Sequence, residues 1–131
     1  MTNIYLDENL SEHVALALNA LNKGYFRDVQ VISTKERFGK GARDEDIIPL
    51  IGAENGVLIT RDFNIRRTKL QFDLCSGYGI GVFFLTLPKG QSKHWDLVKA
   101  LINQWEAMID KVETDAKPYA YRVRGGRMQR M

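Results

Sequence analysis

The chain has 131 residues, of which 44% are hydrophobic and 27% charged, so it is long enough for one globular domain and too short for two. No run approaches 18 consecutive apolar residues, and the N-terminus lacks the pattern of a secretory signal. The single cysteine excludes an internal disulfide. We therefore expect a cytoplasmic protein with no membrane segment.

The net charge of +3 is unevenly distributed along the chain. Residues 117–131 carry five basic and no acidic side chains, so the other 116 residues carry 14 basic and 16 acidic ones, a balance of −2. An arginine-rich end is typical of a phosphate contact, a partner-binding segment or a solubilising tail. The sequence predicts a domain over residues 1–113 and a basic C-terminal tail over residues 114–131.

Strand and helix patterns alternate along the domain. Short apolar runs predict strands, and apolar residues at helical spacing predict helices. In chain order, the expected elements are strand 3–6, helix 11–24, strand 28–34, loop 35–46, helix 44–56, strand 56–60, helix 65–76, strand 80–87 and helix 92–115. This alternation favours an α/β fold with a mainly parallel sheet covered on both faces.

Three segments carry more specific expectations. Pro49 suits the first turn of a helix, so helix 44–56 is expected to begin near residues 46–48. Segment 117–126 either adds a strand or hairpin arm or contacts a partner, with a flexible Gly125-Gly126 pair. The last helix is amphipathic, and its expected core stripe is Trp95, Val98, Leu101, Ile102, Trp105, Met108, Ile109 and Val112.

Acidic side chains follow the predicted strands. Asp7 and Glu8 come directly after strand 3–6, Asp62 comes after strand 56–60, and Asp44 and Asp46 lie at the start of the helix between them. Functional groups of open parallel sheets gather outside the carboxyl ends of the strands, so we expect these acids to converge.

Convergent carboxylates repel one another and raise one another's pKa unless a cation intervenes. Oxygen ligands without clustered histidine or cysteine favour Mg²⁺ or Mn²⁺. Such a metal activates water and polarises a phosphate, which is hydrolytic nuclease chemistry. The alternative is structural: each acid caps a helix or pairs with Arg43, Arg61, Arg66 or Arg67.

Other site types lack support in the sequence. No glycine-rich phosphate loop stands in the strand-to-helix context that it requires. His13 and His94 lie on helical stretches without metal-ligand spacing, so we expect surface or packing roles. Cys75 is expected to be a small buried hydrophobe.

The segments "IYLDENL" (4–10), "ARDEDIIPLIGAENGVLITRD" (42–62) and "NIRR … GIGVFFL" (64–85), in this order, resemble the PIN-like superfamily. The resemblance covers roughly residues 3–87 and is closest to the compact branch with VapC-type toxin ribonucleases and the Mut7-C group. It implies a three-layer α/β/α domain with a central mainly parallel sheet. It also implies RNA cleavage at an acidic cluster that binds one or two Mg²⁺ or Mn²⁺ ions.

The resemblance also implies roles for the acids by position. The strand-one aspartate is Asp7, with Glu8 beside it; the helix acid is Asp44 or Asp46; and the aspartate of the T-x-D element is Asp62. The expected catalytic residues are therefore Asp7, Asp44, Asp46 and Asp62, and the expected metal ligands are Asp7, Glu8, Asp46 and Asp62. Many PIN domains have a fourth acid soon afterwards, where this sequence has Asn64, which favours a single tightly held ion.

Cations must offset the repulsion between the acids and an RNA backbone. The residues expected to bind substrate are Arg61, Asn64, Arg66, Arg67, Arg122 and Arg124. The expected partners are RNA and a small antitoxin protein, with a homodimer as a further option.

The leading hypothesis is a metal-dependent ribonuclease that acts as the toxin of a toxin–antitoxin pair. One alternative is a PIN-like protein that binds nucleic acid or a partner without cutting. Another is an unrelated phospho-acceptor domain, which also places acids at strand ends. The lack of a suitably placed lysine and threonine or serine pair after the later strands argues against it.

Overall fold

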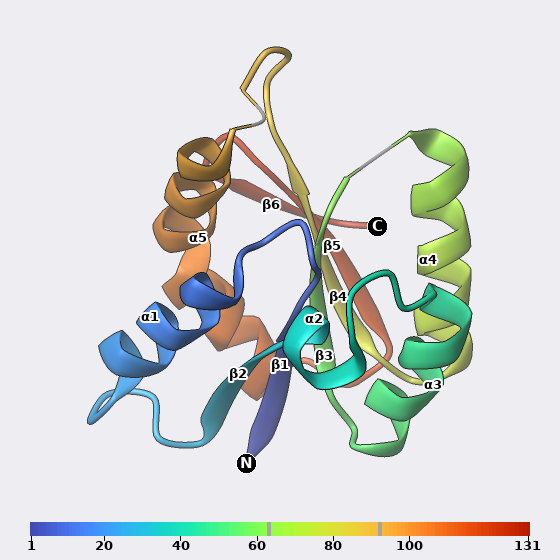
Figure 1. Ribbon diagram of the computed structural model, residues 1–131, viewed down its shortest axis with the longest axis horizontal. Coiled ribbons are helices and arrows are strands. Elements are labelled where there is room, and N and C mark those ends of the chain that lie inside the picture. Colours follow the sequence, from blue (N-terminus) through green and yellow to red (C-terminus); the bar gives the residue numbers. More distant parts are fainter. Residues whose placement is uncertain (63, 92) are drawn as a thin grey trace.

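The computed structural model describes residues 1–62, 64–91 and 93–131 (Figure 1). In this part of the chain, one sheet has the strand order β2-β1-β3-β4-β5-β6, and every neighbouring pair is parallel except β5 and β6. The strands are β1 (Thr2–Leu6), β2 (Val29–Ser33), β3 (Val57–Arg61), β4 (Gly81–Thr86), β5 (Tyr119–Arg124) and β6 (Arg127–Arg130). The helices are α1 (Glu12–Asn22), α2 (Thr34–Phe38), α3 (Asp44–Ala53), α4 (Ile65–Gly77) and α5 (His94–Thr114).

Helices cover both faces of the sheet, with α1 and α5 on one side and α3 and α4 on the other (Figure 1). Because side chains alternate along a strand, each strand contributes to two separate cores. In β3, Val57 and Ile59 pack in the core beneath α1 and α5, whereas Leu58 packs in the core beneath α3 and α4. The three-layer α/β/α fold with a mainly parallel sheet is confirmed.

The expected loop over residues 35–46 contains a short helix, so that part of the prediction is wrong. The Ser33 hydroxyl accepts a hydrogen bond from the backbone N–H of Glu36 at 3.3 Å and caps α2. Gly39, with a φ of 93°, ends the helix and donates its N–H to the Lys35 carbonyl. Ser33 and Glu36 stand at the spacing of a helix-capping pair, which is a signal for the start of α2 in the sequence.

The start of α3 also differs from the expectation. The helix begins at Asp44, so Pro49 lies inside it rather than in its first turn. The Arg43 carbonyl accepts the N–H groups of Asp46 and Ile47, which starts the helix two residues earlier than expected. Three acidic residues in the first turn stabilise this end of the helix.

The expected core stripe of α5 is too wide. Most of the stripe packs against the sheet and α1, but Trp95 is 67% exposed and Ile102 is 49% exposed. Both side chains line a groove between α1 and α5 together with Leu21. The periodicity thus predicted the helix correctly but overestimated the part of the helix surface that the sheet covers.

The basic C-terminal segment is part of the sheet. Strand β5 pairs with β4 in parallel, and Tyr119, Tyr121 and Val123 are buried beneath α5. Gly125 and Gly126, expected to be flexible, have φ values of 52° and 79° and form the two-residue turn of the β5–β6 hairpin. Residues 119–130 therefore fold as strands rather than as a separate tail.

Within the described ranges, none of the helices has the length and apolar character needed to cross a membrane.

Candidate active site

Asp7 follows β1 and is almost fully buried, at 5% exposure. Its carboxylate accepts hydrogen bonds from the Thr60 hydroxyl at 2.7 Å, the Glu8 backbone N–H at 2.9 Å and the Asn9 amide at 3.2 Å. Because side chains alternate along β1, Asp7 lies on the same face of the sheet as Tyr5, toward α3 and α4. Asp7 is thus held in one orientation at the carboxyl edge of the sheet.

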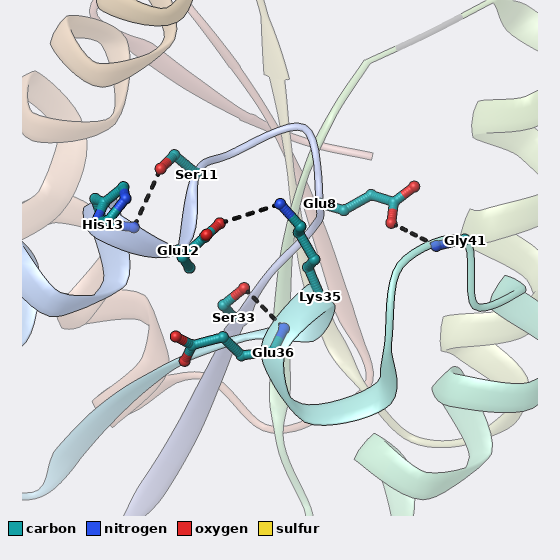
Figure 2. Close-up of polar contacts among 8 residues, drawn as sticks. All are labelled: Glu8, Ser11, Glu12, His13, Ser33, Lys35, Glu36 and Gly41. Carbon is teal, nitrogen blue, oxygen red and sulfur yellow. Dashed lines mark hydrogen bonds and ion pairs between the residues drawn. The ribbon is translucent and has the colours of Figure 1, made fainter.

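The loop after β1 is held by contacts of Glu8 and Ser11, which follow Asp7 in the chain (Figure 2). The Glu8 carboxylate accepts the backbone N–H of Gly41 at 2.9 Å, which ties the loop to the segment before α3. The Ser11 hydroxyl caps α1 by accepting the His13 N–H at 3.1 Å. Glu8 is exposed and serves this loop contact in the structure.

Asp44, the first residue of α3, approaches Asp7. Burial, followed by the negative charge of Asp7, raises the pKa of the Asp44 carboxyl above its usual range. The charge of Arg67 and a hydrogen bond from the Gln71 side chain, at 3.2 Å, act in the opposite direction. Asp7 and Asp44 are therefore two neighbouring carboxylates from separate segments, and the charge of Asp7 disfavours the ionised form of Asp44.

Asp46 does not share this environment. Its side chain is 64% exposed and forms an ion pair with Arg43 at 3.3 Å. Of the two acids left open by the sequence, the structure places Asp44 beside Asp7 and turns Asp46 to the surface.

Gln71 of α4 adds an unusual feature next to Asp44. The Gln71 side chain is fully buried, its amide nitrogen donates to Asp44, and its amide oxygen has no hydrogen-bond partner within residues 1–62, 64–91 and 93–131. A buried acceptor without a donor is costly, by roughly 1–3 kcal/mol. Two mutually repelling carboxylates with an unpartnered amide oxygen nearby are hard oxygen donors, which suit Mg²⁺ or Mn²⁺.

Asp62 has a different set of partners. It follows β3, and its two carboxylate oxygens accept from the Thr68 hydroxyl at 2.8 Å, the Thr86 hydroxyl at 2.8 Å and Arg122 Nε at 3.0 Å. In the described part of the chain, no group of three His, Cys, Asp or Glu side chains is arranged to hold a metal ion. The expected convergence of three acids is thus limited to Asp7 and Asp44.

The other residues expected to bind substrate lie in varied places. Arg61 ends β3 one residue away from Thr60 and therefore points toward the face covered by α1 and α5. The Asn64 side chain caps α4 by accepting the Arg67 N–H at 2.9 Å. Arg66 and Arg67 are exposed in the first turn of α4, and of the two it is Arg67 whose charge acts on Asp44.

Sequence reasoning missed Gln71, Thr68 and Thr86. The first two lie with Cys75 on the buried face of α4, at the spacing i, i+3 and i+7. A helix that buries polar side chains instead of aliphatic ones signals a site beneath it. Thr86 follows the apolar residues of β4 as Thr60 follows those of β3, and this repeat was also readable from the sequence.

The fold and the site together define a small α/β domain with a carboxylate site at the carboxyl edge of a parallel sheet. The sequence profile of the PIN-like domain matches residues 2–87, which is 86 of the 131 residues. The chain therefore belongs to the PIN-like domain family, and its place in a particular branch of that family stays a prediction. No curated protein and no solved structure matches the chain.

Membership of the family carries a general functional meaning. PIN-like domains are commonly nucleases, a class of hydrolases that usually uses divalent metal ions. Asp7, Asp44 and Asp62 all fall within the matched residues, whereas Arg122 and Arg124 follow them.

Proposed function

We propose that this protein is a metal-dependent ribonuclease whose Mg²⁺ or Mn²⁺ ion is held by Asp7 and Asp44. The observation that carries the proposal is the approach of the half-buried Asp44 to the buried Asp7, beside the Gln71 amide oxygen that has no hydrogen-bond partner among the described residues. Mg²⁺ is commonly held by one or two carboxylates, with waters and substrate phosphates as its other ligands. A pair of carboxylates is therefore sufficient.

The chain's own residues divide into two groups in this proposal. Thr60 and Gln71 orient the carboxylates of Asp7 and Asp44 through hydrogen bonds. When bound, the metal supplies a Lewis acid that polarises the scissile phosphate and lowers the pKa of a water.

Arg122 and Asp62 form the substrate side of the site. Asp62 receives the Nε–H of Arg122, so the terminal N–H groups of the guanidinium remain for a ligand. The Arg122 side chain is 42% exposed, so a phosphate oxygen can reach it. Guanidinium suits the geometry of phosphate, and this contact would hold the strand next to the acids.

The experiment is cleavage of labelled single-stranded RNA by the full chain in Mn²⁺, with an EDTA control. Asp7→Asn and Asp44→Asn should each abolish cleavage, because each removes a charge that holds the metal. Asp73→Asn is the matched control, since Asp73 is an exposed acid of α4 that pairs with Lys69. Cleavage that persists in both site variants would contradict the proposal.

For the biological role, we propose the toxin of a toxin–antitoxin pair, with a small antitoxin as partner. The support is the resemblance of "IYLDENL" and "LITRD" to the compact PIN-like branch with toxin ribonucleases. Induced expression of the wild-type chain should arrest growth of a bacterial host, and Asp7→Asn should relieve the arrest. Equal growth with both chains would argue against a toxin.

A second candidate function is a PIN-like protein that binds RNA without cutting it. The observation that favours it concerns Asp62, an acid expected to bind metal. Its carboxylate already accepts hydrogen bonds from Thr68, Thr86 and Arg122. This candidate predicts RNA binding without cleavage in Mg²⁺ or Mn²⁺, so the cleavage experiment separates the two.

A further inference from the structure

Two arginines face each other at the tip of the C-terminal hairpin. Arg124 of β5 is the cross-strand partner of Arg127 in β6, on either side of the Gly125-Gly126 turn. The structure records no acidic side chain paired with either arginine among the described residues. Like charges directly opposite on two strands destabilise a hairpin. The pair is therefore a cost to the fold that a bound anion would remove.

The two arginines lie on the same face of the sheet as the candidate site. Side chains alternate along β5, so Arg124 shares a face with Arg122, while Tyr121 and Val123 point to α5. Arg124 is also the register partner of Thr86, and Thr86 donates to Asp62. A continuous row thus runs across the sheet from Asp62 through Thr86 to Arg124. Arg122, Arg124 and Arg127 form an arginine strip at the end of this row.

The arginines of this strip are accessible to solvent to different degrees, and Arg122 is the least exposed of them. Arg124 and Arg127 are exposed, and β6 is the outermost strand (Figure 1). A pocket of about 370 Å³ is lined by Asp62 and Arg122 and by Lys69 and Phe72 of α4. A cationic strip next to a pocket with an aromatic wall combines the two elements that bind single-stranded nucleic acid.

We propose that the single-stranded substrate leaves the acidic site across this face, with phosphates bound by Arg122, Arg124 and Arg127. The inference rests on the proposed ribonuclease function and assigns the path of its substrate. A chain of phosphates is the ligand that the strip fits, since it offers an anion at each arginine in turn. The same contacts offset the repulsion between Arg124 and Arg127.

Arg130 provides a control within the same strand. It pairs with Tyr121 across the hairpin, so its side chain lies on the opposite face, over the Tyr121 ring and 3.9 Å from Asp115. Arg127→Ala and Arg130→Ala remove the same charge from the same strand. Only the first removes a charge from the proposed path.

The experiment measures binding of the full chain to fluorescein-labelled oligouridylate in EDTA, over a series of salt concentrations. A lost phosphate contact lowers the slope of log affinity against log salt by roughly 0.7 on a single strand. Arg127→Ala should lower the slope by about that amount, and Arg124→Ala with Arg127→Ala by about 1.4. Arg130→Ala should leave the slope unchanged.

A second readout is the melting temperature, measured without RNA and with it. If the opposed arginines repel each other, Arg127→Ala should raise the melting temperature at low salt, and added oligouridylate should stabilise the wild type more than the variant. Equal slopes for Arg127→Ala and Arg130→Ala, or no binding by the wild type, would overturn the inference. If the slopes change as predicted but RNA is not cleaved in Mn²⁺, the proposed ribonuclease function is wrong. The proposed binding of RNA by the three arginines is then still supported.

Discussion

Arg122 Nε lies 3.0 Å from the Oδ2 atom of Asp62, and this ion pair joins β5 to the end of β3. The two residues are 60 positions apart in the chain. Because β4 lies between their strands, the pair spans β4 at the carboxyl edge of the sheet. The C-terminal segment thus contributes directly to the surroundings of an acid within the PIN-like match.

Replacement of Arg122 should therefore weaken the fold as well as RNA binding. Arg122→Leu leaves the Asp62 carboxylate with only its two threonine donors, and we expect a loss of about 1–2 kcal/mol in the free energy of unfolding. A hydrogen bond to a charged group contributes about 1.5–3 kcal/mol, and the partial exposure of Arg122 reduces this value. Urea denaturation measures the loss. Arg66→Leu, on an exposed turn, is the control, and an equal loss in both would contradict the expectation.

Gly81 should tolerate no side chain, because Tyr119 of β5 packs over it. A Cβ atom at Gly81 would lie 2.2 Å from the Tyr119 ring. We expect Gly81→Ala to destabilise the protein by about 1–3 kcal/mol, as overpacking does. At Gly77, the last residue of α4, a Cβ atom would meet nothing within 4 Å. In thermal unfolding, the control Gly77→Ala should have the melting temperature of the wild type. An unchanged melting temperature in Gly81→Ala would contradict the packing of β5 against β4.

Gln71→Leu should separate metal affinity from stability. The variant removes the hydrogen bond that orients Asp44, and loss of such a partner typically lowers metal affinity about 10- to 100-fold. The free energy of unfolding without metal should change by less than about 1 kcal/mol, because the unpartnered amide oxygen is removed at the same time. Calorimetric titration with Mn²⁺ measures the affinity. An unchanged affinity would show that Gln71 has only a packing role.

Tyr5 should make the fold sensitive to alkali. Burial and the hydrogen bond to Glu54 raise the pKa of Tyr5 to about 12, from 10.0. Between these values the unfolded chain loses this proton first, so stability falls as the pH rises from 10 toward 12. Tyr5→Phe should flatten this fall in urea denaturation at alkaline pH. A fall as steep as that of the wild type would exclude Tyr5 as its source.

Most of the fold was readable from hydrophobic pattern. Every predicted strand and long helix exists, because alternation of apolar runs and amphipathic segments is a strong signal. The failures have local causes. The helix α2 depends on its Ser33 cap rather than on an apolar pattern, and α3 begins before Pro49 because backbone hydrogen bonds and acidic residues stabilise its first turn. The exposure of Trp95 depends on how far the sheet reaches beneath α5, which periodicity cannot give.

The candidate site was readable only in part. The position of Asp7 after a buried strand follows from sequence, since strand ends are fixed by the apolar run. The choice of Asp44 over Asp46 depends on the direction in which each side chain leaves the first turn of α3. The ion pair between Asp62 and Arg122 depends on the pairing of β5 with β4, two segments that are distant in the sequence. No local sequence pattern encodes this pairing.

The most direct test of the account is the thermal shift that Mn²⁺ produces in the wild type, Asp44→Asn and Asp46→Asn. Mn²⁺ at about 100 times its dissociation constant should stabilise the wild type by roughly 2.7 kcal/mol, or about 10 °C in a domain of this size. Asp44→Asn should abolish the shift, and Asp46→Asn should retain most of it, because only Asp44 lies beside Asp7. No shift in the wild type, or loss of the shift in Asp46→Asn alone, would contradict the account.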